Sequence, residues 1–486
     1  MSKPIKIYEL KGEDFAKGLS YKSGFPVGGI WGITENFDPF ESYGYLQSSL
    51  DAVTANDTTA TPVVLTTWNE SGTAKLYSHT TSALYEVLDA SPYTTVNKSA
   101  EINVVSPVTG SFIYKTRYIY AQAAVTKVFS NVLPVASASN IEIFDSGGSN
   151  TTWWTPFAVG PDKNLYFVHG DICRITTVSG GGEKTANNGT FLSLESGMYG
   201  RDLVNDGRYL VVIADNNLSN QRGATPSTGT YRCQVAFYDV NSGRSTPEFK
   251  YEFTDSYVVS VRYLDGVVYI FGKENLWACN AVTAPKSVFT FNSGSTITEI
   301  PQTPFQVTQD ANSLYWCGQT NNKIYAFGSL TSGTKKIFYQ PYSSGGVSSA
   351  ITNNGVQFYV GTSSNSQMLK VLNTGTTRTL TTSATASTFL PQPYKFAFAR
   401  VVMKSKLTSG GQVYLGIANN DGNITFAQTK LFTNIGAKQS ILFTLENDTT
   451  ASVKEFNDFK LTIGSNQAIA KVEFWATPID NYDQNI

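Results

Sequence analysis

Histidine, cysteine and charged residues are scarce in this chain of 486 residues. It has two histidines, His79 and His169, and four cysteines, and charged residues make up 15% of it, against roughly a quarter in an ordinary globular domain. Neither histidine has a second histidine or a cysteine at the spacing of a metal site. A Ser-His-Asp site would have to use one of these two residues. We therefore expect no bound metal and no cofactor.

The short motifs of common enzyme sites are also missing. The sequence contains no G-x-S-x-G, no H-E-x-x-H, no G-x-x-x-x-G-K and no S-x-D-x-G-x-x-W repeat. Aspartates such as Asp162, Asp206, Asp215 and Asp310 stand at or near expected turns, where turn preference accounts for them without any chemistry. From these absences we predict that the chain is not an enzyme and has no catalytic residues.

Charge and hydropathy exclude further classes of function. There are 36 basic and 37 acidic residues, and such a balance provides no broad basic surface for a phosphate backbone, so we expect no sequence-specific binding of nucleic acid. No apolar run approaches the ~18 residues of a membrane span. The charged opening MSKPIKIYELKGEDF has no apolar stretch of the kind found in a signal peptide.

A strand-turn-strand unit recurs along the middle of the chain. Its clearest copy is Val258–Val282, where Asp265-Gly266 separates two β-branched and aromatic runs, which is a strong hairpin signal. The central strands of five such units begin 44, 58, 47 and 42 residues apart, at Leu165, Tyr209, Val267, Leu314 and Val356. Short antiparallel strands that repeat every 40–50 residues or so predict a β-propeller.

We predict an all-β protein of three parts. Residues 51–385 form a β-propeller of about seven blades, since residues 62–380 divide into seven units of roughly 46 residues, although six or eight blades also fit. Residues 112–133 are either strands or a short helix. Residues 386–486 contain longer alternating strands and predict a β-sandwich of jelly-roll type. Residues 1–50 do not fit the repeat and are expected to form an extended N-terminal arm.

The arm is Gly-rich and carries isolated large apolar side chains, which cannot build a core of their own. It therefore packs on its own chain or reaches onto a neighbouring subunit. The candidates for this assembly interface are Phe25, Trp31, Phe37 and Phe40.

A second aromatic candidate is the pair Trp153-Trp154. Adjacent strand residues point to opposite faces, so at most one of the two packs inside a blade. The other is a candidate for an exposed contact with a protein or a sugar.

This layout resembles that of virion proteins of tailed bacteriophages, in which a Gly-rich opening precedes a Tyr- and Asn-rich propeller and a β-sandwich. The most specific part is the order G-G-I-x-G, D-P-F and G-x-L within GLSYKSGFPVGGIWGITENFDPFESYGYLQSSL, residues 18–50. The resemblance covers residues 1–385 and rests on layout and composition. It implies a structural tail or neck subunit, of the nozzle or tail-tip kind, that is located in the virion. Such a subunit forms a ring with copies of itself and contacts other virion proteins.

Two alternatives remain beside this hypothesis. One is a carbohydrate-binding propeller that recognises a host surface glycan, as a receptor-binding protein or a surface lectin. The other is a divergent glycan hydrolase. If the arm joins subunits, deletion of residues 1–45 is expected to leave a folded monomer that does not assemble.

Overall fold

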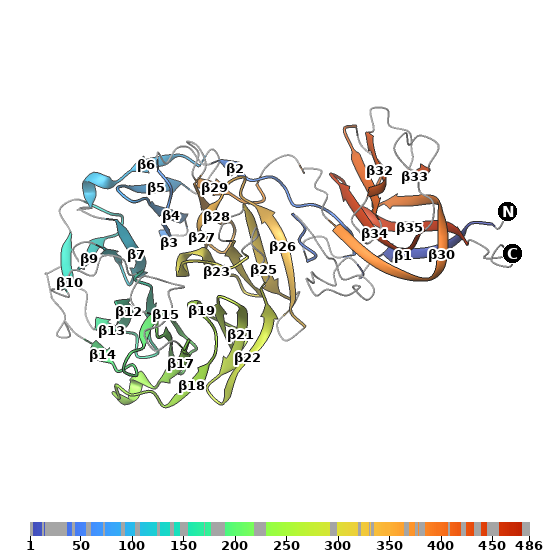
Figure 1. The fold of residues 1–486 in the computed structure, drawn as a ribbon. Coiled ribbons are helices and arrows are strands. Elements are labelled where there is room, and N and C mark those ends of the chain that lie inside the picture. Colours follow the sequence, from blue (N-terminus) through green and yellow to red (C-terminus); the bar gives the residue numbers. More distant parts are fainter. Residues whose placement is uncertain are drawn as a thin grey trace. The chain divides into compact units, whose positions relative to one another are not determined.

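A computed structural model of the chain describes residues 3–478 with gaps. The longer gaps span residues 15–35, 146–153, 176–189, 218–229, 292–298, 432–438 and 445–455. The described part consists of strands β1 to β35 (Figure 1), with short 3-10 helices that include η2 (Ser99–Glu101), η4 (Val240–Ser242) and η5 (Pro304–Gln306). The prediction of an all-β chain is confirmed.

Seven four-stranded sheets form the blades of a propeller. The first four blades are β3–β6 (Val64–Glu70, Thr73–His79, Leu84–Leu88, Thr95–Asn97), β7–β10 (Val108–Tyr114, Arg117–Gln122, Lys127–Val132, Ile141–Asp145), β11–β14 (Phe157–Val159, Leu165–His169, Asp171–Ile175, Thr190–Leu192) and β15–β18 (Tyr199–Asn205, Leu210–Asp215, Cys233–Tyr238, Phe249–Phe253). The other three are β19–β22 (Val258–Leu264, Val267–Gly272, Asn275–Asn280, Thr283–Thr290), β23–β26 (Val307–Gln309, Ser313–Cys317, Lys323–Gly328, Ile337–Ser343) and β27–β29 (Ser348–Asn353, Phe358–Thr362, Leu369–Val371) with β2 (Val53–Thr54). The predicted propeller is confirmed, and residues 112–133 belong to strands β7 to β9 and their connections.

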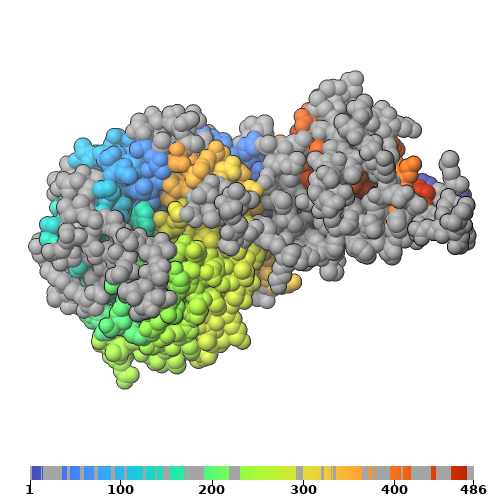
Figure 2. Space-filling view, viewed as in Figure 1, coloured from blue at the N-terminus to red at the C-terminus, as the bar shows by residue number. Residues whose placement is uncertain are grey.

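The innermost strands of the blades form a closed ring. In order, β3, β7, β11, β15, β19, β23 and β27 each contact the next, and β27 contacts β3 (Figure 1). Figure 2 shows the described residues of blades 4 and 5, green to yellow-green, as one continuous surface.

Tight turns with Asp, Asn and Gly begin most blades. Between β19 and β20, Asp265 has φ 54° and Gly266 has φ 78°, as a two-residue hairpin with both central residues at positive φ requires. In blades 4, 6 and 7 a side-chain oxygen of Asp206, Asp310 or Asn354 accepts backbone N–H groups two and three residues ahead. The hairpin signal in the sequence therefore had a direct structural cause.

The central strands of the blades are buried on both faces. In β16, Leu210 and Val212 pack against blade 3, while Val211 and Ile213 pack against blade 5. None of these four side chains is more than 1% exposed. A strand covered on both sides needs apolar residues at every position instead of alternate ones, which explains the continuous apolar runs that marked the repeat.

The propeller is closed by a strand from early in the chain. The two-residue strand β2 is the outermost strand of blade 7, where Val53 pairs with Val371 of β29. The chain therefore enters and leaves the propeller at the same blade. Next to this point, the backbone N–H of Leu50 donates to Oδ1 of Asn373 at 2.8 Å.

By its contacts the chain divides into two compact units. One comprises residues 53–323 and 344–372. The other comprises residues 1–52, residues 324–343, which are the two outer strands of blade 6, and residues 373–486.

The last strands of the chain form a seven-stranded sheet with β1 (Ile5–Lys11). Its order is β1-β35-β30-β34-β31-β32, with β33 also paired to β30. The first half of the long strand β30 pairs with β34, and its second half pairs with β35 and β33. The sheet therefore folds into the two layers of a β-sandwich. Its strands are β30 (Ala384–Met403), β31 (Gln412–Ala418), β32 (Ile424–Leu431), β33 (Ser440–Thr444), β34 (Phe456–Ser465) and β35 (Ile469–Pro478).

The start of the chain is part of this sandwich. Ile5 pairs with Ala476, and Lys11 pairs with Lys471, so Ile5–Lys11 is a strand of the second unit. Leu10 of β1 is 1% exposed. The predicted boundaries of arm, propeller and sandwich, and the jelly-roll type, stay predictions.

Candidate functional site: the central cavity of the propeller

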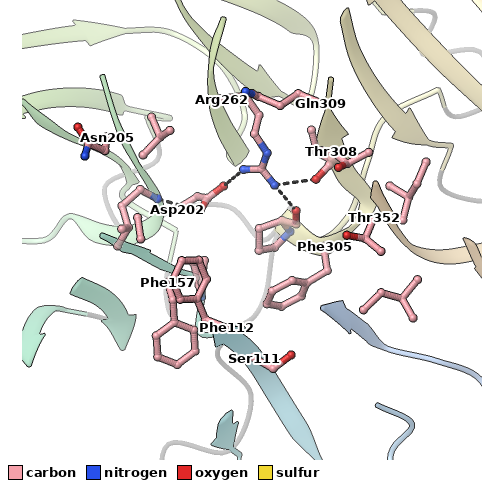
Figure 3. Close-up of a pocket in the computed structure, with 18 of the residues that line it drawn as sticks. Ser111, Phe112, Phe157, Asp202, Asn205, Arg262, Phe305, Thr308, Gln309 and Thr352 are labelled. Atoms are coloured by element: carbon pink, nitrogen blue, oxygen red, sulfur yellow. Dashed lines mark hydrogen bonds and ion pairs between the residues drawn. The ribbon is translucent and has the colours of Figure 1, made fainter. Parts of the chain in front are cut away.

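A cavity of about 400 Å³ lies at the centre of the propeller (Figure 3). Every blade contributes residues of its innermost strand or of the segment just before it. In blade order these include Leu65, Phe112, Phe157, Asp202, Arg262, Phe305 and Thr352. The volume falls in the range of roughly 300–1,000 Å³ that is typical of small-molecule sites.

The polar centre of the cavity wall is an ion pair between two blades. Nη1 of Arg262, on β19, donates to Oδ2 of Asp202, on β15, at 2.8 Å. Asp202 is 3% exposed and Arg262 is 20% exposed. Asp202 Oδ2 also accepts Ser260 Oγ at 2.7 Å and the N–H of Val261 at 3.0 Å. Its other oxygen, Oδ1, accepts the N–H of Leu203 at 2.8 Å, so both carboxylate oxygens are hydrogen-bonded, Oδ2 by blade 5.

The same arginine also reaches blade 6. Its Nη2 donates to the carbonyl oxygens of Pro304, at 2.8 Å, and Val307, at 2.7 Å. Figure 3 shows the guanidinium between Asp202 and this segment. Arg262 therefore joins three consecutive blades, and its bonds make it a structural tie in the cavity wall.

Side-chain hydrogen bonds join every pair of neighbouring blades around the ring. They are of several chemical kinds, and each links an innermost strand, or the residues just before one, to the next blade. Going round from blades 1 and 2, the bonds are Thr66 to Ser111, Thr109 to Thr155, Asn205 to the carbonyl of Val159, Ser260 to Asp202, Gln309 to the carbonyl of Tyr263, Gln306 to the carbonyl of Ser348, and Thr67 to the carbonyl of Asn353. The cavity is therefore held in shape by its own wall.

Three phenylalanine rings form the apolar part of the wall. Figure 3 shows Phe112, Phe157 and Phe305 on the same side of the Arg262–Asp202 pair. The ring centroids of Phe112 and Phe157 are 6.3 Å apart.

Gln309 contributes an acceptor without a partner. Its Nε2 donates to the carbonyl of Tyr263 at 3.0 Å, but its Oε1 is buried and has no hydrogen-bond partner among the described residues. Thr308 and Thr352 add hydroxyl groups to the cavity wall. Among the described residues that line the cavity, Asp202 and Arg262 are the ionisable ones, so the wall carries no net charge.

A second buried ion pair corrects our interpretation of Asp215. This residue is not a turn residue but the last residue of β16, and it is 0% exposed. It accepts Nε and Nη2 of Arg201 at 2.9 and 2.6 Å, and Oδ2 accepts the N–H of Val258 at 3.2 Å. The pair links blades 4 and 5 inside the core.

His79 lies away from the cavity. It ends β4 and is wholly buried, with its ring stacked on that of Tyr118, 5.7 Å away between centroids. Burial lowers its pKa to about 3. Neither ring nitrogen has a hydrogen-bond partner in the part of the chain that the structure describes, so His79 is an uncharged component of the interface between blades 1 and 2.

The described residues contain no group of three or more His, Cys, Asp or Glu side chains arranged to hold a metal ion. Cys233, Cys279 and Cys317 are free and buried. In the described ranges, no helix has the length and apolar character needed to cross a membrane.

The predicted aromatic candidates fall in different places. Phe25, Trp31 and Trp153 lie outside the described residues. Phe37 is 3% exposed, and its N–H donates to the carbonyl of Gln340 at 3.0 Å. Phe40 packs edge-on against Tyr339, with ring centroids 5.2 Å apart. Both side chains thus contact their own chain, and their assembly role stays a prediction.

Trp154 is partly buried and lies next to the cavity. Its ring meets that of Phe305 edge-on, 5.7 Å away between centroids. The sequence had singled out this tryptophan but not the cavity, because the wall comes from seven segments spread between Leu65 and Thr352.

No family model and no curated protein matches the chain. Solved propeller structures are similar to it. A virginiamycin B lyase from Staphylococcus aureus is 14% identical, with a TM-score of 0.47 over 66% of this chain and 98% of the lyase. A gluconolactonase from Xanthomonas campestris is 12% identical, with a TM-score of 0.37 over 68% of this chain and 99% of its own. PorZ, a component of the type-IX secretion system of Porphyromonas gingivalis, is 11% identical, with a TM-score of 0.42 over 78% of this chain and 46% of PorZ.

These comparisons correct the prediction that the chain is not an enzyme. Two of the similar structures, the lyase and the gluconolactonase, are enzymes, so missing sequence motifs do not exclude catalysis on this fold. At these identities the likeness shows the fold alone, and it assigns no reaction to the chain.

Proposed function

We propose that the chain is a structural subunit of a tailed-bacteriophage particle, in its tail or neck, that forms a ring with copies of itself and contacts other virion proteins. The order of opening segment, propeller and sandwich is the layout on which the resemblance to such virion proteins rests. The single observation that carries the proposed assembly is the open sandwich sheet, which begins at β1 and ends at β32.

A ring requires two different complementary surfaces on each subunit. The two ends of one sheet are such surfaces, because an edge strand has backbone groups that a strand of another chain can pair with. Strand β1 also carries Ile5, a large apolar side chain that is 45% exposed. We propose that the β1 edge of one copy meets the β32 edge of the next.

The position of β1 changes the deletion experiment that the sequence suggested. Removing residues 1–45 also removes a strand of the sandwich and the buried side chain of Leu10. A loss of assembly would then have two explanations. A point substitution on the exposed part of β1 tests the proposal more cleanly.

Substituting Ile5→Lys is expected to weaken ring formation and leave the fold intact, because it places a charge on the proposed contact. The matched control is Val282→Lys, at a side chain that is 78% exposed in the turn between β21 and β22. Negative-stain electron microscopy and mass photometry of the full chain over a range of concentrations measure the assembly.

Rings from the unmodified chain and from Val282→Lys, with fewer from Ile5→Lys, would support the proposal. Monomers at every concentration, or equal assembly of both variants, would contradict it. The location in the particle is tested separately, by labelling purified tailed particles with antibodies against the full chain.

A further inference from the structure

We infer that the central cavity is a binding site for one neutral sugar residue of a glycan. This activity goes beyond the proposed assembly role and does not depend on it, because the cavity lies within the propeller unit and the assembly contact within the sandwich. The charge, the polar groups, the rings and the size of the cavity support this inference.

The two charged side chains of the wall, Asp202 and Arg262, are already hydrogen-bonded within the protein and offer no open site to a charged ligand. Both terminal nitrogens of Arg262 already donate to protein oxygens, Nη1 to Asp202 and Nη2 to Pro304 and Val307. Asp202 in turn accepts hydrogen bonds from three donors of blade 5. An anion or cation would have to break these bonds before it could form its own. The ligand that fits is uncharged.

The polar groups that remain suit a ligand rich in hydroxyls. Gln309 lines the cavity, and its buried Oε1 accepts no hydrogen bond from the described residues. Its amide must turn toward the cavity for a ligand to donate to Oε1 and so satisfy an otherwise costly group. The hydroxyls of Thr308 and Thr352 also line the cavity and can both donate and accept. A purely apolar ligand would take the hydroxyls of Thr308 and Thr352 out of water without replacing their hydrogen bonds and is therefore disfavoured.

The rings of Phe112, Phe157 and Phe305 cover the opposite part of the cavity. A sugar ring has an apolar face of C–H groups and an edge of hydroxyls, and it can use both kinds of wall at once. This combination of aromatic surface and a few placed polar groups is what small-molecule sites generally show.

The size of the cavity limits the ligand to a short one. At about 400 Å³ it lies near the lower end of the range of roughly 300–1,000 Å³ for ligand sites. The hydrogen bonds that join all seven blades oppose expansion of the ring. We therefore assign to the cavity a single terminal residue and not the interior of a long polysaccharide.

The test uses the full chain and named probes. Glucose, galactose, mannose and N-acetylglucosamine are screened by saturation-transfer NMR, and neutral and sialylated glycans are screened on an array. Two substitutions of the wall, Gln309→Leu and Thr352→Val, remove polar groups with little change of volume. The control is Thr283→Val, at an exposed position of the outer strand β22, and a thermal unfolding curve of each variant checks that it is folded.

Binding of at least one neutral sugar is expected. Each wall substitution should weaken it by about tenfold, as the loss of one ligand hydrogen bond does, while Thr283→Val leaves it unchanged. Binding that survives both wall substitutions would place the site elsewhere and overturn the inference. So would exclusive binding of sialylated glycans, or no binding of any probe. Ring formation, measured on the same samples, reports on the assembly proposal alone.

Discussion

At the scale of single residues, burial decides what the few ionisable side chains can do. His79 is held without charge because its ring is wholly buried beside Tyr118, and its pKa falls to about 3. Cys279, in a different blade, is also buried, and burial raises its pKa to about 12. Both side chains act as packing residues.

His79 is expected to make the folded chain less stable in acid. The pKa is 6.5 in an ordinary histidine and about 3 in the folded chain. Between these values the unfolded chain binds a proton at His79 that the folded chain does not, so the free energy of unfolding rises with pH across this window. Urea unfolding at several pH values between about 4 and 7 measures the slope.

The matched variant is His79→Phe, which keeps a ring against Tyr118 but cannot be protonated. Its free energy of unfolding should depend less on pH than that of the unmodified chain. The slope against pH should be smaller by up to the amount that one bound proton contributes. Equal slopes for the two proteins would show that His79 is not the buried neutral group described here.

At the scale of the strand and the turn, local sequence signals were reliable where a local cause exists. The Asp265-Gly266 hairpin and the apolar run of β16 were both recognised, because turn geometry and burial on both faces act on neighbouring residues. Short elements were missed. The strand β2 has two residues, too few for any periodicity, and its role becomes visible only through its partner Val371.

Substitution by alanine should destabilise the chain by different amounts at Gly266, in a hairpin turn, and at Gly110, on an inner strand. Gly266 has φ 78°, and a Cβ there would meet nothing within 4 Å, so only backbone strain opposes Gly266→Ala, at about 1 kcal/mol. A Cβ on Gly110 would stand 1.9 Å from the carbonyl oxygen of Thr155 in the next blade. Gly110→Ala must separate two blades and should cost more, about 3 kcal/mol.

Urea unfolding of both variants beside the unmodified chain measures the difference. The comparison is internal, since each glycine serves as control for the other. A Gly266→Ala loss equal to or larger than that of Gly110→Ala would contradict the close approach of blades 2 and 3.

At the scale of the whole molecule, the cavity could not be predicted because its parts are far apart in the chain. Asp202 and Arg262 are 60 residues apart, and neither belongs to a motif. The number of blades was predicted because the repeat is periodic. The pairing of β1 with β35 was not predicted, since the residues IKIYELK contain no signal that specifies a partner strand at the other end of the sequence. Short sequence motifs could not reveal the cavity either, because the fold assembles its wall from separate segments.

Arg262 is expected to be a main stabiliser of the propeller ring. Arg262→Met removes its bonds to blades 4 and 6 and leaves the carboxylate of Asp202 without its charged partner. We expect a loss of about 3 kcal/mol in the free energy of unfolding, the lower end for a broken buried pair, since Arg262 is 20% exposed.

The control is Arg244→Met, at an exposed position between β17 and β18, which should change stability by less than about 0.5 kcal/mol. Combining Arg262→Met with Asp202→Asn should cost less than the sum of the two single losses, because the buried charge is then removed as well. Additive losses, measured by urea unfolding, would show that the two residues do not interact.

The pairing of β1 with β35 also affects the order in which parts of the chain can fold during synthesis. Ile5 pairs with Ala476, which the ribosome adds 471 residues later (476 − 5). At roughly 5–20 residues per second, the first strand waits on the order of half a minute to a minute and a half for its neighbour. Blade 7 needs only Leu369–Val371 to pair with β2. The order of synthesis therefore lets the propeller close first, while the first strand of the sandwich is still without its partner.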